Sequence, residues 1–183
     1  MMQQPSLKPR PTLDSLGIAR KPVYLRKLKK RTAWDPQDIS GNASRVFPKQ
    51  TNSLFLVANE EDLYKVAAAL NSGKSTHDGM NDGGSFIWIT TDELEVCGIP
   101  LHPERDEQQI KCPAAQKLHK NAAGEEAVWL RLCKLLAQGN RLVPITEGQM
   151  KSMNQWLRPQ GCWSYTENRI RKCDLCPSET AGL

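Results

Sequence analysis

Gly73-Lys74-Ser75-Thr76 is the stretch of this sequence that most resembles a nucleotide-binding motif. It matches the end of a phosphate-binding loop, Gly-x-x-x-x-Gly-Lys-Ser/Thr, in which main-chain amides at the start of a helix bind phosphate. Here Ala68 occupies the first glycine position, and the spacing of apolar residues predicts a helix that ends near Asn71. The motif would therefore follow the negative end of a helix dipole, which disfavours anions. We expect no nucleotide at Gly73–Thr76.

Three of the six cysteines lie near the C-terminus and suggest a second kind of chemistry. Cys173 and Cys176 form a Cys-x-x-Cys pair, and Cys162 precedes this pair. Thiolates in such a pattern bind structural zinc if a fourth ligand completes the site, and the candidates are distant ones: Cys112, His102 or His119. Reduced thiols without metal, or a disulfide or redox pair, are the alternatives. The expected cofactor content is none, or one structural zinc held by Cys162, Cys173 and Cys176.

The sequence contains no arrangement of catalytic residues that we can assign. Its three histidines, His77, His102 and His119, lie in polar stretches without a neighbouring nucleophile or carboxylate motif. Asp78 and Asp82 lie in a glycine-rich loop and are the basis of our third hypothesis, a metal-dependent nuclease. The sequence therefore favours a protein that is not an enzyme.

Charge is distributed unevenly along the chain. The 183 residues carry 25 Lys and Arg against 20 Asp and Glu, and residues 1–50 contain 11 of these cations but 3 of the acids. Prolines in the same stretch remove backbone donors and disfavour helix, and few apolar residues are present to form a core. We predict that residues 1–50 form a basic, Pro-rich extended arm. Residues 51–183 are then a single α+β domain with a Cys-containing C-terminal extension from about residue 158.

The centre of the predicted arm has the composition of a nucleic-acid-binding segment. Cations release counterions from phosphates, and aromatic rings stack on unpaired bases. The predicted contacts are Arg20, Lys21, Tyr24, Arg26, Lys27, Lys29, Lys30, Arg31 and Trp34. The same segment could instead bind an acidic protein or only aid solubility, because a basic cluster is an unspecific signal.

A second basic segment follows the turn at residues 158–161. A helix that begins at Ser164 would present Asn168, Arg169 and Arg171, which are residue types that contact base edges and phosphates. The predicted nucleic-acid contacts in this segment are Arg169, Arg171 and Lys172. The turn does not match that of a helix-turn-helix, so we expect a peripheral basic helix rather than a recognition helix.

The elements that must position these residues begin at residue 53. Apolar β-prone runs predict strands at 53–58, 86–90, 94–99 and 141–145, of which the second and third form a hairpin and the last lies at a sheet edge because of Pro144. Apolar residues at helical spacing predict helices over 60–71, 125–136 and 146–157, and Pro113 starts a possible short helix. This order fits the α+β class: a small antiparallel or mixed sheet with about three helices packed on one face, preceded by the extended basic arm.

Charge and element pattern together favour a non-catalytic, nucleic-acid-associated protein. We expect an accessory subunit of a prokaryotic ribonucleoprotein or mobile-element complex, with RNA or single-stranded DNA and protein subunits as partners. The alternative is an adaptor or inhibitor whose basic arm docks on an acidic protein. The sequence contains neither a run of 18 apolar residues nor a leader-like N-terminus, so we expect no membrane contact and a cytoplasmic location.

Overall fold

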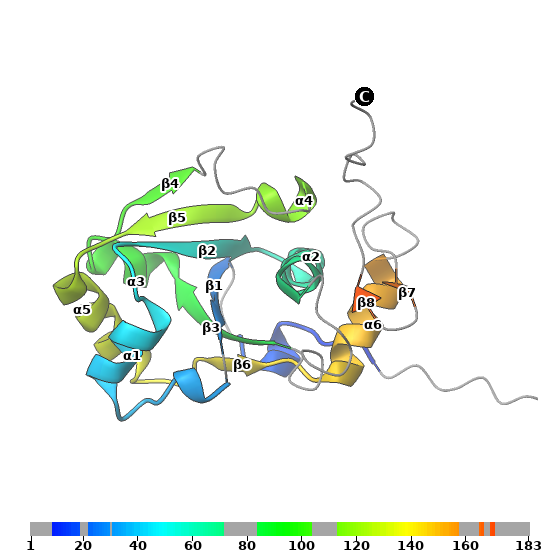
Figure 1. Ribbon diagram of the computed structural model, residues 1–183, viewed down its shortest axis with the longest axis horizontal. Coiled ribbons are helices and arrows are strands. Elements are labelled where there is room, and N and C mark those ends of the chain that lie inside the picture. The colour runs from blue at the N-terminus through cyan, green and yellow to red at the C-terminus, as the bar shows by residue number, and fades with distance from the viewer. Residues whose placement is uncertain are drawn as a thin grey trace, which may run out of the picture.

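A six-stranded antiparallel sheet forms the centre of the protein, in the strand order β4-β5-β2-β1-β3-β6 (Figure 1). The computed structural model describes residues 9–18, 22–29, 31–71, 84–103, 113–157, 165–166 and 169–170. The strands are β1 (Val23–Leu28), β2 (Thr51–Val57), β3 (Ser85–Thr90), β4 (Leu101–Pro103), β5 (His119–Ala123) and β6 (Leu142–Pro144). The helices are α1 (Ile39–Val46), α2 (Glu60–Asn71), α3 (Thr91–Val96), α4 (Pro113–Gln116), α5 (Glu126–Leu136) and α6 (Glu147–Leu157), with 3-10 turns η1 (Asp14–Leu16) and η2 (Arg31–Ala33). The predicted α+β class is confirmed.

β1 lies in the middle of this sheet, which corrects the prediction of an extended arm over residues 1–50. β1 pairs with both β2 and β3 in antiparallel register, and α1 also lies within the predicted arm. Val23, Tyr24, Leu25 and Leu28 are buried, while Arg26 is half-buried. We did not predict this strand, because the segment is rich in cations and prolines. Pairing with distant strands, and not local composition, decides whether such a segment forms a strand. Consequently the boundary predicted at residue 50 falls between elements of one sheet.

Helices cover both faces of the sheet, where the sequence predicted one covered face (Figure 1). Phe86 and Trp88 of β3 face a core shared with α2 and α6, whereas Ile87 and Ile89 face a second core shared with α1, α3 and α5. All six residues of β3 are buried. A continuous apolar run is typical of a strand that is buried on both sides, and this signal was present in the sequence.

Residues 91–96 form the helix α3, so the predicted hairpin of strands 86–90 and 94–99 is wrong. Glu93 N donates to Thr90 Oγ1 at 3.2 Å, and Thr90 N donates to Glu93 Oε2 at 2.9 Å. This capping box satisfies amides at the start of the helix and outweighs the β propensity of the following residues. Cys97 follows α3 and is buried, and burial raises the pKa of its thiol.

Several local predictions are confirmed. The helices predicted over 60–71 and 146–157 are α2 and α6. Both begin with side-chain caps, because Asp62 N donates to Asn59 Oδ1, and Thr146 and Gln149 form a capping box. β6, which contains Pro144, lies at a sheet edge, and the short helix after Pro113 is α4. No helix among the described residues has the length and apolar character needed to cross a membrane.

Two strands of the main sheet and the C-terminal region differ from expectation. β4 and β5 lie in a polar stretch for which the sequence predicted no strand. β7 (Tyr165–Thr166) and β8 (Arg169–Ile170) form a separate two-stranded antiparallel sheet, so the helix predicted from Ser164 is wrong. Tyr, Thr and Ile are strand-prone residue types, which is consistent with this pairing.

Candidate functional site

The two aromatic residues of the predicted nucleic-acid contacts are part of the protein core. Tyr24 is 8% exposed and Trp34 is 6% exposed, and both pack in the core on the α1 and α5 side of the sheet. A base needs a free ring face for stacking. These rings are not available to a base in the folded protein.

Arg26 is committed to hydrogen bonds inside the protein. Its guanidinium donates to Val46 O at 2.9 Å, to Ser53 O at 3.0 Å and to Asn52 Oδ1 at 3.3 Å. These acceptors belong to the end of α1 and the beginning of β2. The Arg26 side chain therefore connects β1 to α1 and β2, directly after Leu25, the last residue of β1 that pairs with β2. Burial lowers the pKa of Arg26 to about 10. Its role is structural.

Lys27 and Lys29 differ in what surrounds their ammonium groups. Lys27 Nζ donates to Leu70 O in the last turn of α2, where a cation also interacts favourably with the helix dipole. Lys29 follows β1 directly, is exposed, and has no hydrogen bond or ion pair with the described part of the chain. Of the predicted contacts with described side chains, Lys29 is the one exposed cation.

The other predicted site residues lie outside the described residues or are described by their main chain alone. Outside lie Arg20, Lys21, Lys30, Arg171, Lys172, Cys162, Cys173, Cys176, Gly73–Thr76, Asp78 and Asp82. Arg31 in η2 and Arg169 in β8 have described main chains. Over the described ranges, no group of three His, Cys, Asp or Glu side chains could hold a metal ion.

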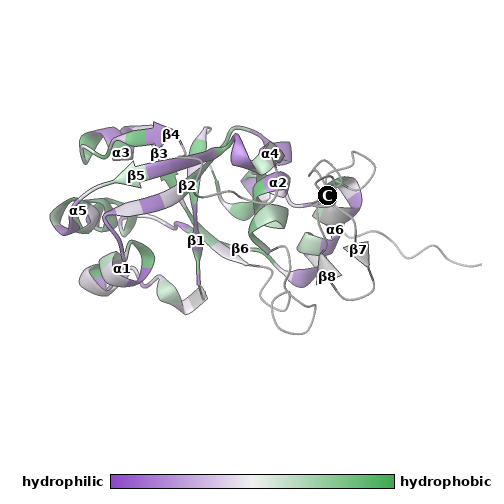
Figure 2. Cartoon of the chain, turned by 45° about the horizontal axis from the view of Figure 1, so that its top comes forward, coloured by the Kyte–Doolittle hydropathy of each residue, from purple (hydrophilic) through white to green (hydrophobic). Residues whose placement is uncertain are grey.

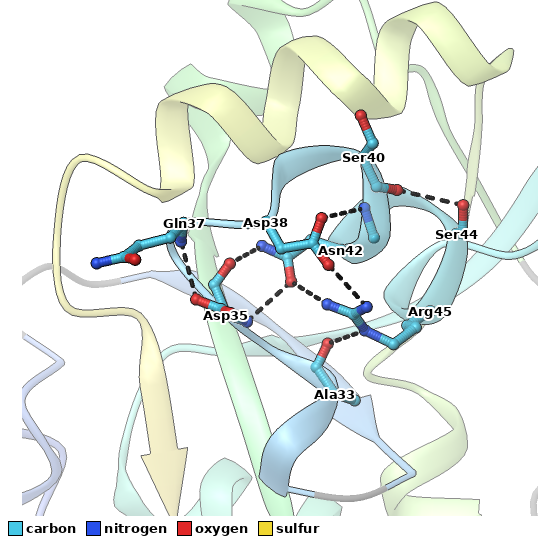
Figure 3. Close-up of polar contacts among 9 residues, drawn as sticks. Ala33, Asp35, Gln37, Asp38, Ser40, Asn42, Ser44 and Arg45 are labelled. Carbon is cyan, nitrogen blue, oxygen red and sulfur yellow. Dashed lines mark hydrogen bonds and ion pairs between the residues drawn. The ribbon is translucent and has the colours of Figure 1, made fainter.

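A polar network fixes the loop that follows Lys29 (Figure 3). Asp35 N donates to Asn42 Oδ1 at 2.9 Å, and Asn42 Nδ2 donates back to Asp35 O at 2.5 Å. Arg45 forms an ion pair with Asp38 at 2.9 Å and donates through Nε to Ala33 O at 3.2 Å. Because Asp38 balances the charge of Arg45, we do not count Arg45 among the candidate phosphate contacts.

A row of polar side chains crosses three strands on the α2 face of the sheet. His102 on β4 pairs with Asn121 on β5, and Asn121 pairs with Ser53 on β2. Directly paired residues point to the same face, with neighbouring Cβ atoms about 5 Å apart. The adjacent pair, Phe55 and His119, has its rings 5.0 Å apart and marks the border of the α2-side core. We call His102, Asn121 and Ser53 the polar row; Figure 2 shows this hydrophilic part of β5 beside β2.

The cations of β1 lie at the same end of the sheet. Lys27 pairs with Phe86, a residue of the α2-side core, so Lys27 shares the face of the polar row, and Lys29 follows two residues later. None of the six strands of the sheet contains Asp or Glu. This end of the sheet therefore combines cations with neutral polar groups.

Asn121 has an unusual environment within the polar row. It is 8% exposed, and its Oδ1 atom is buried and accepts no hydrogen bond from the described part of the chain. Nearby His119 is also buried, and burial, Lys120 and Arg26 lower the pKa of its imidazole, so this ring is neutral at pH 7. We did not identify Asn121 or Ser53 from the sequence. The signal available in the sequence was the spacing of His119 and Asn121, two residues apart, which is that of side chains on one face of a strand.

A surface hollow of about 800 Å³ opens between α1 and α5. Phe47 and Trp129 lie among its lining residues, together with the charged residues Lys49, Glu125 and Glu126. The hollow combines apolar surface with charges of both signs. Such a surface suits contact with a protein better than contact with a phosphate chain.

These features define a class: an α+β protein whose antiparallel sheet is covered by helices on both faces and carries cations and neutral polar groups at one end. Comparison of the chain with protein-family models, with curated proteins and with solved structures gives no match.

Proposed function

We propose that this protein is a non-catalytic accessory subunit of a nucleic-acid-containing assembly, such as a prokaryotic ribonucleoprotein or mobile-element complex. In this proposal, phosphate groups bind at the end of the sheet where β1 finishes. The position of Lys29 carries the proposal: it is exposed, it directly precedes Lys30 and Arg31 in the chain, and it lies at the end of a carboxylate-free sheet.

Counterion release provides the driving force for such a contact. Each cation that neutralises a phosphate changes the salt dependence of log affinity by about −0.7 on a single strand, so Lys29, Lys30 and Arg31 together correspond to a slope of about −2. Contacts with phosphate carry no direct sequence information. Three contacts give modest affinity, which suits a subunit held in place by protein partners as well.

The hollow between α1 and α5 is our candidate for the protein-facing side. Glu125 and Glu126 lie at its border and would repel a phosphate chain, while Pro48 and Leu130 offer apolar surface. The mixed charges therefore favour a protein subunit as the occupant of this hollow.

A triple substitution tests the phosphate contact. We expect Lys29→Ala, Lys30→Ala and Arg31→Ala together to weaken binding to unrelated single-stranded oligonucleotides and to flatten the salt slope, measured by fluorescence anisotropy at several salt concentrations. The matched control replaces Lys49, Arg131 and Lys134 with Ala, because these three exposed cations lie by α1 and α5. The control should bind as the parent does.

Other outcomes of the same experiment separate the remaining hypotheses. Unchanged binding and slope in the Lys29 triple variant would overturn the proposal. No binding of nucleic acid by the parent, together with salt-sensitive binding of an acidic protein, would establish the adaptor. Metal-dependent cleavage that is lost after Asp78→Ala and Asp82→Ala would establish the nuclease.

A further inference from the structure

We propose that residues 158–172, which follow α6, dock in a surface hollow between α2 and α6 of the same chain. This hollow has a volume of about 800 Å³ and is lined by residues 9–12, the first half of α2 and the second half of α6. We call it the α2–α6 hollow. Its volume lies within the range of clefts that bind ligands, about 300 to 1,000 Å³. The docking does not depend on the proposed function.

Trp156 provides aromatic surface in the α2–α6 hollow. Its half-buried indole ring contacts the ring of Tyr64 edge to face, with centroids 5.4 Å apart, and the guanidinium of Arg10 lies 5.4 Å from the indole centroid. All three residues line the hollow. Trp, Tyr and Arg are the residue types enriched at the energetically dominant positions of protein interfaces. The composition of the hollow therefore favours a polypeptide as its occupant.

The chain leaves α6 at the border of the α2–α6 hollow, because Trp156 is the last residue but one of this helix. Residues 158–164 connect α6 to β7, and a connection of this length spans at most about 25 Å when extended. Figures 1 and 2 both show β7 and β8 beside α6, at the opposite end of the molecule from α1 and α5. The segment after α6 can therefore reach this hollow through a short connection.

The hairpin of β7 and β8 requires a supporting surface. Tyr165 pairs with Ile170, and Thr166 pairs with Arg169, so each strand has two residues. A single two-stranded hairpin is marginally stable at best in water and gains stability by packing on another element. Tyr165 and Ile170 share one face of the hairpin because they are directly paired. We propose this face as the one that covers Trp156.

The charges of the hollow and of the segment are complementary. Among the lining residues, Glu60 and Glu61 outnumber Arg10, whereas residues 158–172 contain four cations and one acid. Glu61 also pairs with Lys65, but a surface ion pair of this kind adds little stability and does not prevent a second contact. The basic segment therefore fits the hollow better than an acidic one would.

Residues 1–8 are the alternative occupant from the same chain, since Pro9 also borders the hollow. They contain one cation and no aromatic residue. They therefore offer less charge and less aromatic surface than residues 158–172.

Hydrogen exchange of the full chain, measured by mass spectrometry, tests the docking from the side of the segment. We expect the amides of residues 162–172 to be protected in the parent protein. Gln155→Lys adds a cation to the α2–α6 hollow at an exposed position and should raise their exchange rate at least about fivefold. Gln138→Lys adds the same charge at an exposed position after α5 and is the control, which should exchange as the parent does.

Hydroxyl-radical footprinting of Trp156 tests the docking from the side of the hollow. Tyr165→Ser together with Ile170→Ser removes the apolar face of the hairpin and should increase oxidation of Trp156 about threefold, because local opening exposes the indole. Thr166→Ala changes the other face, since successive residues of a strand alternate between faces, and should leave oxidation unchanged.

Three results would overturn the docking. The first is exchange of residues 162–172 in the parent at the rate of an unstructured peptide. The second is protection that Gln155→Lys does not reduce, because the hairpin would then be held elsewhere. The third is oxidation of Trp156 that rises after deletion of residues 1–8 but not in the hairpin variant, which would assign the hollow to the N-terminal segment. None of these results concerns the binding of oligonucleotides, so the proposed function would stand in each case.

Discussion

The indole ring of Trp129 stacks on the phenyl ring of Phe47, with ring centroids 4.7 Å apart and ring planes inclined by 6°. Phe47 directly follows α1, and Trp129 lies in α5, so the stack joins the first fifty residues to the remainder of the domain. We expect Phe47→Ala to lower the free energy of unfolding by about 3 to 5 kcal/mol. A double-mutant cycle with Trp129→Leu, measured by urea unfolding, should give a coupling of about 1 kcal/mol. Additive effects would show that the stack adds nothing beyond burial.

A fragment of residues 51–183 should not fold, because it lacks the central strand β1 and also α1. The domain boundary that the sequence predicted at residue 50 implies the opposite, namely that this fragment folds by itself. Circular dichroism and the dispersion of amide NMR signals measure the outcome. A fragment that starts at Pro9 is the control and should fold. A cooperative, unchanged melting transition for the shorter fragment would contradict the position of β1.

Glu93 and Arg141 form an ion pair whose loss should be costly. Arg141 Nη2 lies 2.6 Å from Glu93 Oε1, the side chains are 13% and 17% exposed, and the guanidinium lies 4.1 Å from the ring centroid of Trp88. We expect Glu93→Gln to destabilise the protein by about 3 kcal/mol, since it leaves a largely buried cation unpaired while Gln can still cap α3. Adding Arg141→Met should restore most of this loss in thermal unfolding. A larger loss in the double variant would refute this explanation.

His119 should make stability depend on pH in the acidic range. Burial, Lys120 and Arg26 lower the pKa of His119 in the folded protein, whereas the unfolded chain has the ordinary value of about 6.5. Below about pH 6.5 the unfolded state therefore binds more protons than the folded state. The free energy of unfolding consequently decreases as the pH is lowered, until the pH passes below the pKa of His119 in the folded protein. His119→Phe should reduce the difference in unfolding free energy between pH 7.5 and pH 5. His102→Gln, at an exposed histidine, should retain it; equal slopes in parent and His119→Phe would contradict the assignment.

Zinc content tests the prediction made for Cys162, Cys173 and Cys176, which lie outside the described residues. If these thiolates bind zinc, elemental analysis of the purified protein should find close to one metal ion per chain, and Cys173→Ser should release it. Cys97→Ala is the control, because Cys97 is buried next to α3. Folded protein without metal would end this hypothesis.

Local signals in the sequence predicted most helices of the domain. Apolar residues at helical spacing predicted α2, α5 and α6 correctly, because amphipathic periodicity is encoded within a few neighbouring residues. The caps at Asn59 and Thr146 are equally local signals for the starts of α2 and α6. The apolar runs predicted β2 and β3 for the same reason. Thr90 with Glu93 is an equally local signal for the start of α3. We predicted a strand at 94–99 instead, because we gave more weight to the strand propensity of these residues.

The sequence by itself therefore determined the α+β class, the uneven charge and the helix starts, whereas tertiary structure decided the role of each cation. Arg26, Lys27 and Lys29 lie within four residues, yet one is buried among carbonyls, one bonds to the end of α2 and one is exposed. Their surroundings come from elements distant in the chain. The polar row has the same origin, since Asn121 meets Ser53 and His102 only through strand pairing. Periodicity and capping act between near neighbours, but the pairing of distant strands depends on the free energy of burying both sheet faces together.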